Sequence, residues 1–348
     1  MGHEIPLVNS FRQYENIRRD KNIFEGVEMF HKKRFIKDFK RDELIEDVFV
    51  VRFKKPIEQY KNGYKFELRV GDSTKEIMFK LWGPSSEELV RKIYDEIRVD
   101  DFVLLKARVN EWNNSLELSA NELSSVRKIQ IEQVDLKDFI AASKRDLDKM
   151  YAELESYMET IVDEEIKGFI DMLFSDKDFI VAFKNAPASM YKHHNWVGGL
   201  MEHTLNVLSI ASDVMKIHSD LDRDFVIAGA LIHDIGKVEE FKVTSNIKVG
   251  EEGMLLGHIT IGLEMISRII PAIKIDPVKA LKLKHILLSH HGELEYGSPK
   301  KPAFPEALLV HMADELDARL NSMQMAKDNA NTEDAYIYTQ DFGNIYLK

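Results

Sequence analysis

Residues 225 to 237 read Phe-Val-Ile-Ala-Gly-Ala-Leu-Ile-His-Asp-Ile-Gly-Lys, and this stretch decides the fold of the second half of the chain. It is apolar on nearly all sides, which predicts a buried helix, yet it contains the polar pair His233 and Asp234. Leaving such a pair unsatisfied costs on the order of several kcal/mol, whereas a metal ion neutralises the carboxylate and takes the imidazole lone pair. One His-Asp dipeptide alone is more often structural, so its companions decide the interpretation.

Further imidazole and carboxylate residues face inward on the neighbouring predicted helices. His203 shares an apolar stripe with Val207 and therefore points toward the core. Three more sites follow on later predicted helices: His258, His290 with His291, and Asp314. A lone inward histidine is usually a core residue, but four such sites on successive helices are hard to explain as core. The pattern therefore predicts a metal site.

Seven ligands are too many for one ion, whereas two ions that share a bridging carboxylate would use all of them. The first ion is assigned to His203, His233, Asp234 and Asp314. The second is assigned to Asp234, as the bridge, with His258, His290 and His291. Two metals about 3.5 to 4 Å apart activate a shared water and stabilise charge on phosphorus, which predicts phosphate-ester hydrolysis with Asp234 at its centre. Lys237 could reach a phosphate oxygen as a point charge, or could be a solvated surface lysine.

The composition restricts the metal and the location. The 348 residues include no cysteine, so any metal must be held by nitrogen and oxygen, which favours Mn, Mg, Fe, Co or Zn. With 44% hydrophobic and 31% charged residues, the chain reads as a soluble protein of two domains. Because the longest apolar run is far below the roughly 20 residues of a membrane span and no signal-peptide pattern is seen, we expect a cytoplasmic protein without a membrane partner.

The first half reads differently, as a small β-barrel. Strands are predicted at 48–53, 64–70 and 77–82, a helix at 85–97, and two further strands at 102–109 and 116–120, with a short helix near 41–46. Three strands, a helix and two strands is the order of a five-stranded OB-fold barrel, whose open face commonly binds single-stranded nucleic acid.

Basic and aromatic residues are interleaved along these strands. Between Val50 and Trp82 there are eight Lys/Arg against four Asp/Glu, although the whole chain carries a net charge of -11. Cations beside stacking platforms suit a nucleic-acid strand. The candidate contacts are Arg52, Lys54, Phe66, Arg69, Lys80, Trp82 and Trp112. The competing interpretation is that half of the aromatic residues in an alternating strand simply fill the barrel.

Four motifs carry a family resemblance. His203, His233-Asp234 and Asp314, in this order, resemble the HD superfamily of metal-dependent phosphohydrolases, and His258 with His290-His291 resembles its binuclear branch. The segments 186–189, 193–204, 233–237 and 289–299 closely resemble YhaM-type 3′-to-5′ exoribonucleases. The resemblance covers 135–346 strongly and 47–129 more loosely.

The resemblance implies an OB-fold ahead of an all-helical HD domain, and Mn²⁺-dependent release of nucleoside monophosphates from RNA 3′ ends, with some activity on single-stranded DNA. The family's metal ligands match the seven residues above without substitution. His193 and His194 also match, and would contact substrate or form a loop that caps the Gly198-Gly199 turn. The expected divisions are an N-terminal extension at 1–46, the OB-fold domain at 47–129, a helical linker at 130–150, the HD domain at 151–320 and a tail at 321–348.

Two other functions fit the same ligands. One is an HD-type phosphohydrolase of small nucleotides or cyclic dinucleotides, although the residues after His291 lack the Gly-Tyr-Pro signature of the cyclic-dinucleotide subgroup. The other is a nucleic-acid-binding adaptor with an inactive HD domain, against which the complete ligand set argues. The sequence does not indicate an oligomeric state.

Overall fold

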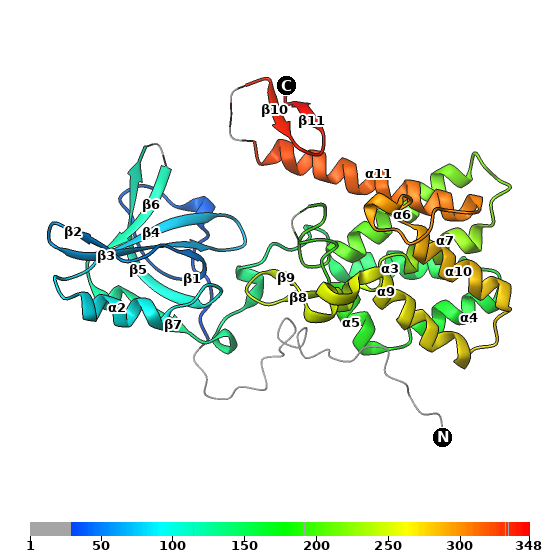
Figure 1. Ribbon diagram of the computed structural model, residues 1–348, viewed down its shortest axis with the longest axis horizontal. Coiled ribbons are helices and arrows are strands. Elements are labelled where there is room, and N and C mark those ends of the chain that lie inside the picture. The colour runs from blue at the N-terminus through cyan, green and yellow to red at the C-terminus, as the bar shows by residue number, and fades with distance from the viewer. Residues whose placement is uncertain (1–28, 114, 191, 331, 333) are drawn as a thin grey trace. The chain divides into compact units, whose positions relative to one another are not determined.

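A computed structural model describes residues 29–113, 115–190, 192–330, 332 and 334–348. The chain divides into two compact units, described separately below (Figure 1). The N-terminal unit comprises the described residues up to Ala142 together with Val243–Asn246, and the C-terminal unit comprises Ser143–Lys242 and Ile247–Lys348. The part of the expected extension at 1–28 lies outside the described residues.

The N-terminal unit is a closed β-barrel. Its strands are β1 Leu44–Lys54, β2 Glu58–Tyr60, β3 Gly63–Gly71, β4 Glu76–Trp82, β5 Phe102–Trp112, β6 Ser115–Ala120 and β7 Val126–Ile129. Five of them form a ring in the order β1-β3-β4-β6-β5, which closes by pairing of β5 with β1. The β4–β6 pair is parallel and the other ring pairs are antiparallel. With helix α2, Glu87–Glu96, between β4 and β5, this confirms the predicted OB-fold.

Strand alternation builds the barrel core. In β4 the residues Ile77, Phe79 and Leu81 point inward and are buried, while the residues between them are partly exposed. Each fully buried side chain of this size contributes about 1.5–3 kcal/mol. Helix α2 adds Val90, which is completely buried against this core.

The helix predicted near residues 41–46 is wrong. Strand β1 already begins at Leu44, which pairs with Arg108 of β5. The ladder to β5 offers these residues more hydrogen bonds than an isolated helical turn would. Earlier in the expected extension, Ile36 and Phe39 are buried in the barrel core, so this segment is part of the domain.

The C-terminal unit is helical. Its helices are α3 Leu147–Met158, α4 Glu164–Leu173, α5 Lys177–Asn185, α6 Gly199–Met215, α7 Arg223–Ile232, α8 Lys237–Glu240, α9 Glu251–Ile269, α10 Pro277–Ser289 and α11 Pro305–Asp328. Two hairpins complete the chain: β8 Phe241–Val243 with β9 Ile247–Val249, and β10 Tyr336–Thr339 with β11 Gly343–Tyr346. Short 3-10 turns lie in the N-terminal unit at Ile36–Asp38, Leu123–Ser125, Ile131–Gln133 and Leu136–Asp138, and in the C-terminal unit at Ile270–Ala272 and Leu294–Tyr296. A helical HD domain after the barrel is therefore confirmed, with the hairpin of β10 and β11 added to it; of the other hairpin, Val243–Asn246 belongs to the N-terminal unit.

Aspartate residues fix where many of these helices begin. Five N-caps each accept hydrogen bonds from two backbone N–H groups of the first turn: Asp146, Asp163, Asp176, Asp222 and Asp276. Such a cap contributes about 1 kcal/mol and places the helix start to within a residue. These caps therefore fix, from the local sequence, where five helices begin and which way their side chains point: α3, α4, α5, α7 and α10.

Helix α9 is interrupted inside by a glycine. It begins at Glu251, and Gly257 interrupts it with φ 70° and ψ 157°. His258 therefore opens the second straight part of the helix. Among the described residues, Glu251–Ala272 is the one helix long and apolar enough to span a membrane. Of its most apolar window 39% is buried, and one helix that meets this test by length and composition alone is weak evidence for a membrane.

Candidate metal centre

The seven predicted ligands come together in the C-terminal unit. They project from α6 (His203), the end of α7 (His233 and Asp234), α9 (His258), the end of α10 (His290 and His291) and α11 (Asp314). The ligand atoms of Asp234, His258, His290 and His291 lie within 4.8 Å of one another, and so do those of His203, His233 and Asp314. The two groups match the division into two sites made from the sequence, with Asp234 between them.

Asp234 is buried and presents one carboxylate oxygen to each group. Its Oδ1 lies 3.5 Å from Nε2 of His258 and 3.4 Å from Nε2 of His290. Its Oδ2 lies 3.6 Å from Nε2 of His203 and 3.4 Å from Nε2 of His233. A carboxylate placed in this way can bridge two cations, one on each side.

The tautomers of the rings are fixed by their outer hydrogen bonds. Three of them donate Nδ1–H to a backbone carbonyl, which can only accept: His233 to Ala230 at 2.8 Å, His290 to Leu287 at 2.7 Å and His291 to Tyr296 at 2.9 Å. The proton is therefore on Nδ1, and the Nε2 lone pair faces the cluster. Metal-ligating histidines are held in the same way.

Two carboxylates that sequence reasoning missed support the other rings. Asp317 accepts from Nδ1 of His203 at 2.7 Å, and Glu240 lies 3.3 Å from Nδ1 of His258. Asp317 follows Asp314 by one helical turn on α11, so the i, i+3 spacing of two acids was the available signal. Burial would lower the pKa of His203, but its hydrogen bonds to Asp314 and Asp317 outweigh this and raise the pKa to about 9.

Three buried atoms at the centre have no hydrogen-bond partner within the described part of the chain: Oδ1 of Asp234, Nε2 of His258 and Nε2 of His290. On the other side of Asp234, the Nε2 atoms of His203 and His233 face each other at 3.2 Å. Buried acceptors left unsatisfied are costly, and they converge on common points. The residues present therefore fit divalent cations held by imidazole nitrogen and carboxylate oxygen.

Lys237 is buried, and its Nζ lies 2.6 Å from Oδ2 of Asp234. Burial disfavours the charged amine, but the negative charge of Asp234 outweighs this and raises the pKa of Lys237. Conversely, burial would raise the pKa of Asp234, while Lys237 and His233 hold it well below its usual range. The side chain also lines the cavity described next, so it is not a solvated surface lysine.

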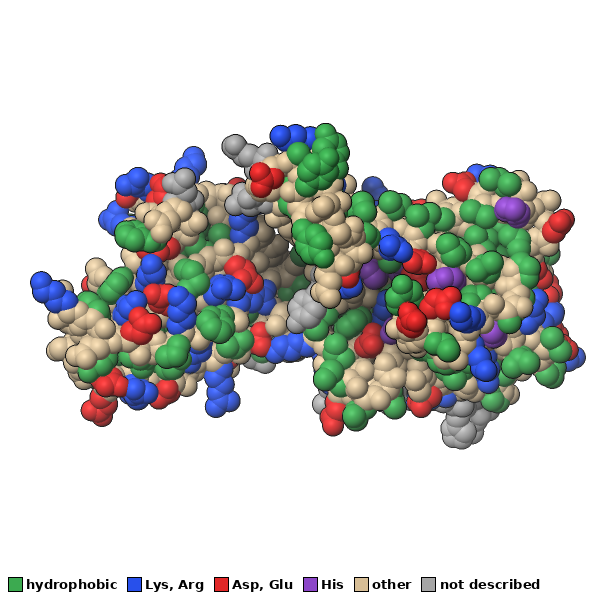
Figure 2. All heavy atoms as spheres, turned by 45° about the horizontal axis from the view of Figure 1, so that its top comes forward, with side chains coloured by type: hydrophobic (Ala, Val, Ile, Leu, Met, Phe, Trp, Pro, Cys, Tyr) green, Lys and Arg blue, Asp and Glu red, His purple; other side chains and the backbone are tan. Residues whose placement is uncertain are grey.

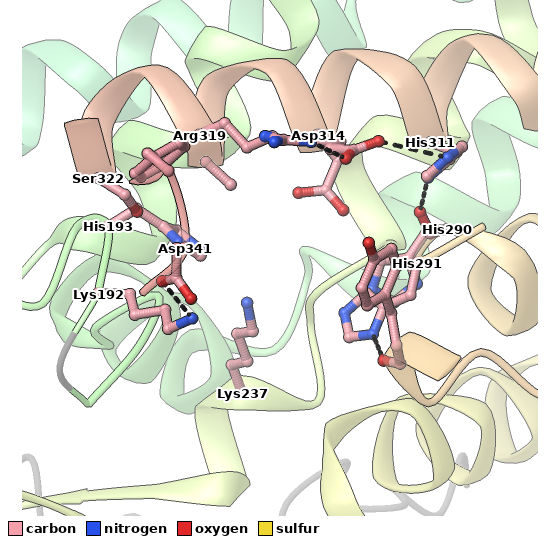
Figure 3. Close-up of a pocket in the computed structure, with 14 residues that line it drawn as sticks. Lys192, His193, Lys237, His290, His291, His311, Asp314, Arg319, Ser322 and Asp341 are labelled. Carbon is pink, nitrogen blue, oxygen red and sulfur yellow. Dashed lines mark hydrogen bonds and ion pairs between the residues drawn. The ribbon is translucent and has the colours of Figure 1, made fainter. Parts of the chain in front are cut away.

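A cavity of about 430 Å³ opens beside the cluster (Figure 3). Its lining includes the cluster residues His290, His291 and Asp314. The lining also includes residues that no sequence motif marked: Lys192, Tyr296, His311, Glu315, Arg319, Ser322, Asp341 and Phe342. The volume lies in the range of small-molecule sites. A ligand bound there would touch the predicted metal ligands directly.

The two histidines expected to contact substrate have different positions. His193 lines the cavity, and burial followed by the positive charge of Lys237 lowers its pKa to about 3. His194 is 1% exposed, and its Nε2 lies 2.9 Å from Asp317. Its burial and its contact with Asp317 favour the structural interpretation of His194 over a substrate contact. A Cβ on Gly199 would overlap the carbonyl of His194, which supports the loop-capping interpretation.

Four of the nucleic-acid candidates on the barrel are committed to internal contacts. Phe66 is 1% exposed, which favours the competing interpretation that its ring fills the barrel. The other three are cations with internal partners: Arg52 donates to the carbonyl of Phe139 at 3.0 Å, Lys54 to that of Tyr94 at 2.5 Å, and Lys80 to the carboxylate of Glu117 at 2.5 Å. Lys54 thereby caps the carboxyl end of α2. These side chains stabilise the barrel instead of forming a free basic face.

The remaining barrel candidates stay accessible. The Arg69 side chain is 54% exposed and Trp112 is 65% exposed, while Trp82 is half-buried with its ring edge-on to Tyr60 at 5.0 Å. On the face seen in Figure 2, basic and acidic side chains are interspersed over this unit, without one large basic patch. Any nucleic-acid strand on this unit would therefore meet local cations and single aromatic rings.

Comparisons with known proteins identify the family to which the chain belongs. Residues 200–319 match the HD domain family. The protein named 3′-5′ exoribonuclease YhaM of Shouchella clausii is 33% identical over 260 residues, which cover 74% of this chain and 78% of that protein. Its namesake from Bacillus subtilis is 30% identical over 266 residues, covering 76% and 82%. A solved structure of Schizosaccharomyces pombe Pot1pC bound to ssDNA is 12% identical, and the match covers 28% of this chain and 86% of that one. Its TM-score of 0.22 is too low to support a conclusion. From the identity and coverage of the first two relatives, the chain belongs to the YhaM family of 3′-5′ exoribonucleases.

Proposed function

We propose that the protein is a metal-dependent 3′-to-5′ exonuclease that hydrolyses single-stranded RNA, and single-stranded DNA as a second substrate, to nucleoside monophosphates. The observation that carries the proposal is that unpartnered buried atoms converge on one side of Asp234 while the Nε2 atoms of His203 and His233 face each other on its other side, beside an open cavity. The names of the YhaM relatives support the RNA substrate and the 3′-to-5′ polarity.

Two divalent ions would occupy the site, and Mn²⁺ is the ion that we propose, with Mg²⁺, Co²⁺, Fe²⁺ and Zn²⁺ as alternatives. One would be held by His203, His233, Asp234 and Asp314, and the other by Asp234, His258, His290 and His291. When bound, such a pair lowers the pKa of a water to near neutrality and stabilises the charge that develops on phosphorus.

The protein's own groups would prepare the site. The fixed Nδ1–H contacts hold the rings so that their Nε2 atoms face inward before any ion binds. Lys237 lies at the cavity wall beside Asp234, where its positive charge would stabilise a phosphate oxygen of the substrate. We propose Asp234 and Lys237 as the residues nearest to the chemistry.

A time course on 5′-labelled single-stranded RNA and DNA tests this function. Protein stripped with a chelator should be inactive, and reloading with Mn²⁺, Mg²⁺, Co²⁺ or Zn²⁺ identifies the active ion. We expect a ladder that shortens from the 3′ end, with nucleoside monophosphates as products. An intact oligonucleotide beside cleaved small nucleotides or cyclic dinucleotides would instead support a small-molecule phosphohydrolase. Binding without any hydrolysis would support an adaptor.

The barrel would hold the single strand that enters the metal site. Replacing Trp112 by alanine is expected to weaken binding of long single-stranded RNA about five- to 150-fold, because one base-aromatic stack contributes about 1–3 kcal/mol. Hydrolysis of a small phosphodiester should not change. Leu89→Ala removes another exposed apolar side chain of the same unit and serves as the control. Fluorescence anisotropy with a labelled RNA measures both, and equal affinities of the two variants would remove Trp112 from the binding face.

A further inference from the structure

The C-terminal hairpin brings residues 340–342 to the active-site cavity. Thr339 of β10 pairs with Gly343 of β11, so these three residues form the turn. Gly343 has φ 67°, a conformation that favours glycine, and the backbone N–H of Phe342 donates to Oγ1 of Thr339 at 3.2 Å. Asp341 and Phe342 line the same cavity as Asp314 and His290. A segment expected to be a simple tail thus forms part of the wall.

Two contacts hold the turn against the cavity rim. Nζ of Lys192 lies 2.8 Å from Asp341, and Figure 3 shows this pair at the side of the cavity away from His290 and His291. The guanidinium of Arg319, on α11, lies 5.8 Å from the ring centroid of Phe342. The side chains of Lys192 and Asp341 are 62% and 52% exposed, so their ion pair contributes at most about 1 kcal/mol. The contact therefore positions the turn with only a small gain in stability.

Phe342 has the chemistry of a stacking platform. Two aromatic residues, Tyr296 and Phe342, are among the residues that line the cavity. The carbonyl of Tyr296 holds the ring of His291, so Tyr296 already serves the metal cluster. The Phe342 ring is half-buried in the wall with a cation near it, and aromatic rings flanked by arginine bind bases in single-stranded nucleic acid.

We propose that Phe342 stacks on the base of the terminal nucleotide of the substrate, with Arg319 beside it, while Lys192 positions the turn through Asp341. This rests on the proposed exonuclease function. The cavity of about 430 Å³ has room for a single nucleotide, whose phosphate would lie toward Asp314 and Lys237. Because every base has a π-face, such a platform accepts all four bases and discriminates against a missing one.

A cycle that combines Phe342→Ala with a substrate lacking its 3′-terminal base tests the proposal. For the intact protein, removing the base should raise KM about five- to 150-fold, the equivalent of one stack. Phe342→Ala should raise KM by a similar factor on the normal substrate and should respond little to loss of the base. Phe342→Tyr should restore KM to nearly the original value. In a direct binding measurement, Phe342→Ala should weaken binding of adenosine 5′-monophosphate by the same factor.

Controls separate this inference from the proposed function. Tyr338→Ala changes a 77% exposed ring on the same hairpin outside the cavity lining, and should leave all parameters unchanged. Turnover of bis-p-nitrophenyl phosphate by Tyr338→Ala should equal that of the unaltered protein. Suppose that the unaltered protein digests RNA, and that loss of the base raises KM by the same factor in Phe342→Ala as in the unaltered protein. The stacking role is then overturned. If the unaltered protein cleaves only the small ester, the exonuclease proposal fails, and unchanged nucleotide binding by Phe342→Ala would then overturn the platform as well.

Discussion

Asp234→Asn is expected to lower kcat on single-stranded RNA by about a thousandfold or more and to reduce the number of bound divalent ions. Each oxygen of Asp234 faces a different group of imidazoles at 3.4 to 3.6 Å, so loss of its charge weakens both sites at once. Removing a single group that stabilises transition-state charge already costs about 10² to 10³ in kcat. Metal content per chain and single-turnover rates after reloading with Mn²⁺ measure the two effects.

Loss of stability could imitate this result, because the same substitution leaves Lys237 without its partner. Breaking a buried ion pair destabilises by about 3–5 kcal/mol. The double variant Asp234→Asn/Lys237→Met removes the unpaired charge, and we expect it to recover thermal stability but not metal binding. Asp171→Asn makes the same change at an exposed position of α4 and should match the unaltered protein. Two bound ions and an unchanged kcat in Asp234→Asn would contradict the bridging assignment.

Helical periodicity explains why the cluster was predictable. A polar residue on a stripe of buried apolar residues must point inward, and five helices offered such residues in turn. The hydrogen bonds that fix the tautomers were not predictable in this way, because their acceptors are backbone carbonyls. His233 and His290 bond the carbonyls of Ala230 and Leu287, three residues earlier in each case. These are carbonyls of the last helical turn, so the bonds depend on where each helix ends.

Supporting residues and tertiary neighbours were harder to predict. Asp317 reads as one more charge on a charged helix until α11 is placed against α6, where it meets His203 and Asn206. The turn at Asp341 and Phe342 lines the cavity only because the hairpin folds back to Lys192, 149 residues away in sequence. Local patterns carry no information about such long-range contacts.

For Phe66 in the barrel, strand alternation was available as a local rule, but the prediction followed the basic composition of the segment instead. Phe66 has the same strand parity as Leu68 and Val70, and all three are buried. Alternation alone therefore places its ring inside. The interpretation as a stacking residue depended on composition, because basic neighbours suggested nucleic acid. Lys54 could not be assigned from parity, since its partners are the last carbonyls of α2.

Gly236→Ala is expected to lower kcat about a hundredfold or more and to destabilise the C-terminal unit by about 1–3 kcal/mol, although the backbone there suits any residue. Gly236 has φ -63° and ψ -19°, so no strain arises from the dihedral angles. The difficulty is steric, because an added Cβ would overlap the carbonyl oxygen of His258 and lie 2.7 Å from the backbone nitrogen of Gly262. Overpacking against rigid backbone carries this cost in stability. A shift of about 1 Å in a catalytic group can cost a hundredfold in rate.

A series of glycine substitutions distinguishes this clash from a general intolerance of alanine. At Gly168 in α4 an added Cβ meets nothing within 4 Å, so Gly168→Ala should stabilise by about 0.5–1 kcal/mol and leave kcat unchanged. At Gly262 the nearest atom is Cδ1 of Leu287 at 3.2 Å, a flexible side chain that can yield, so a small effect is expected. The loss in free energy of unfolding, measured by urea denaturation, and the loss of bound metal should both be largest for Gly236→Ala, small for Gly262→Ala and absent for Gly168→Ala. Gly236→Ala could keep both ions and full activity only if α8 and α9 can separate without disturbing His258. That result would show that the packing of Gly236 does not control the second metal site.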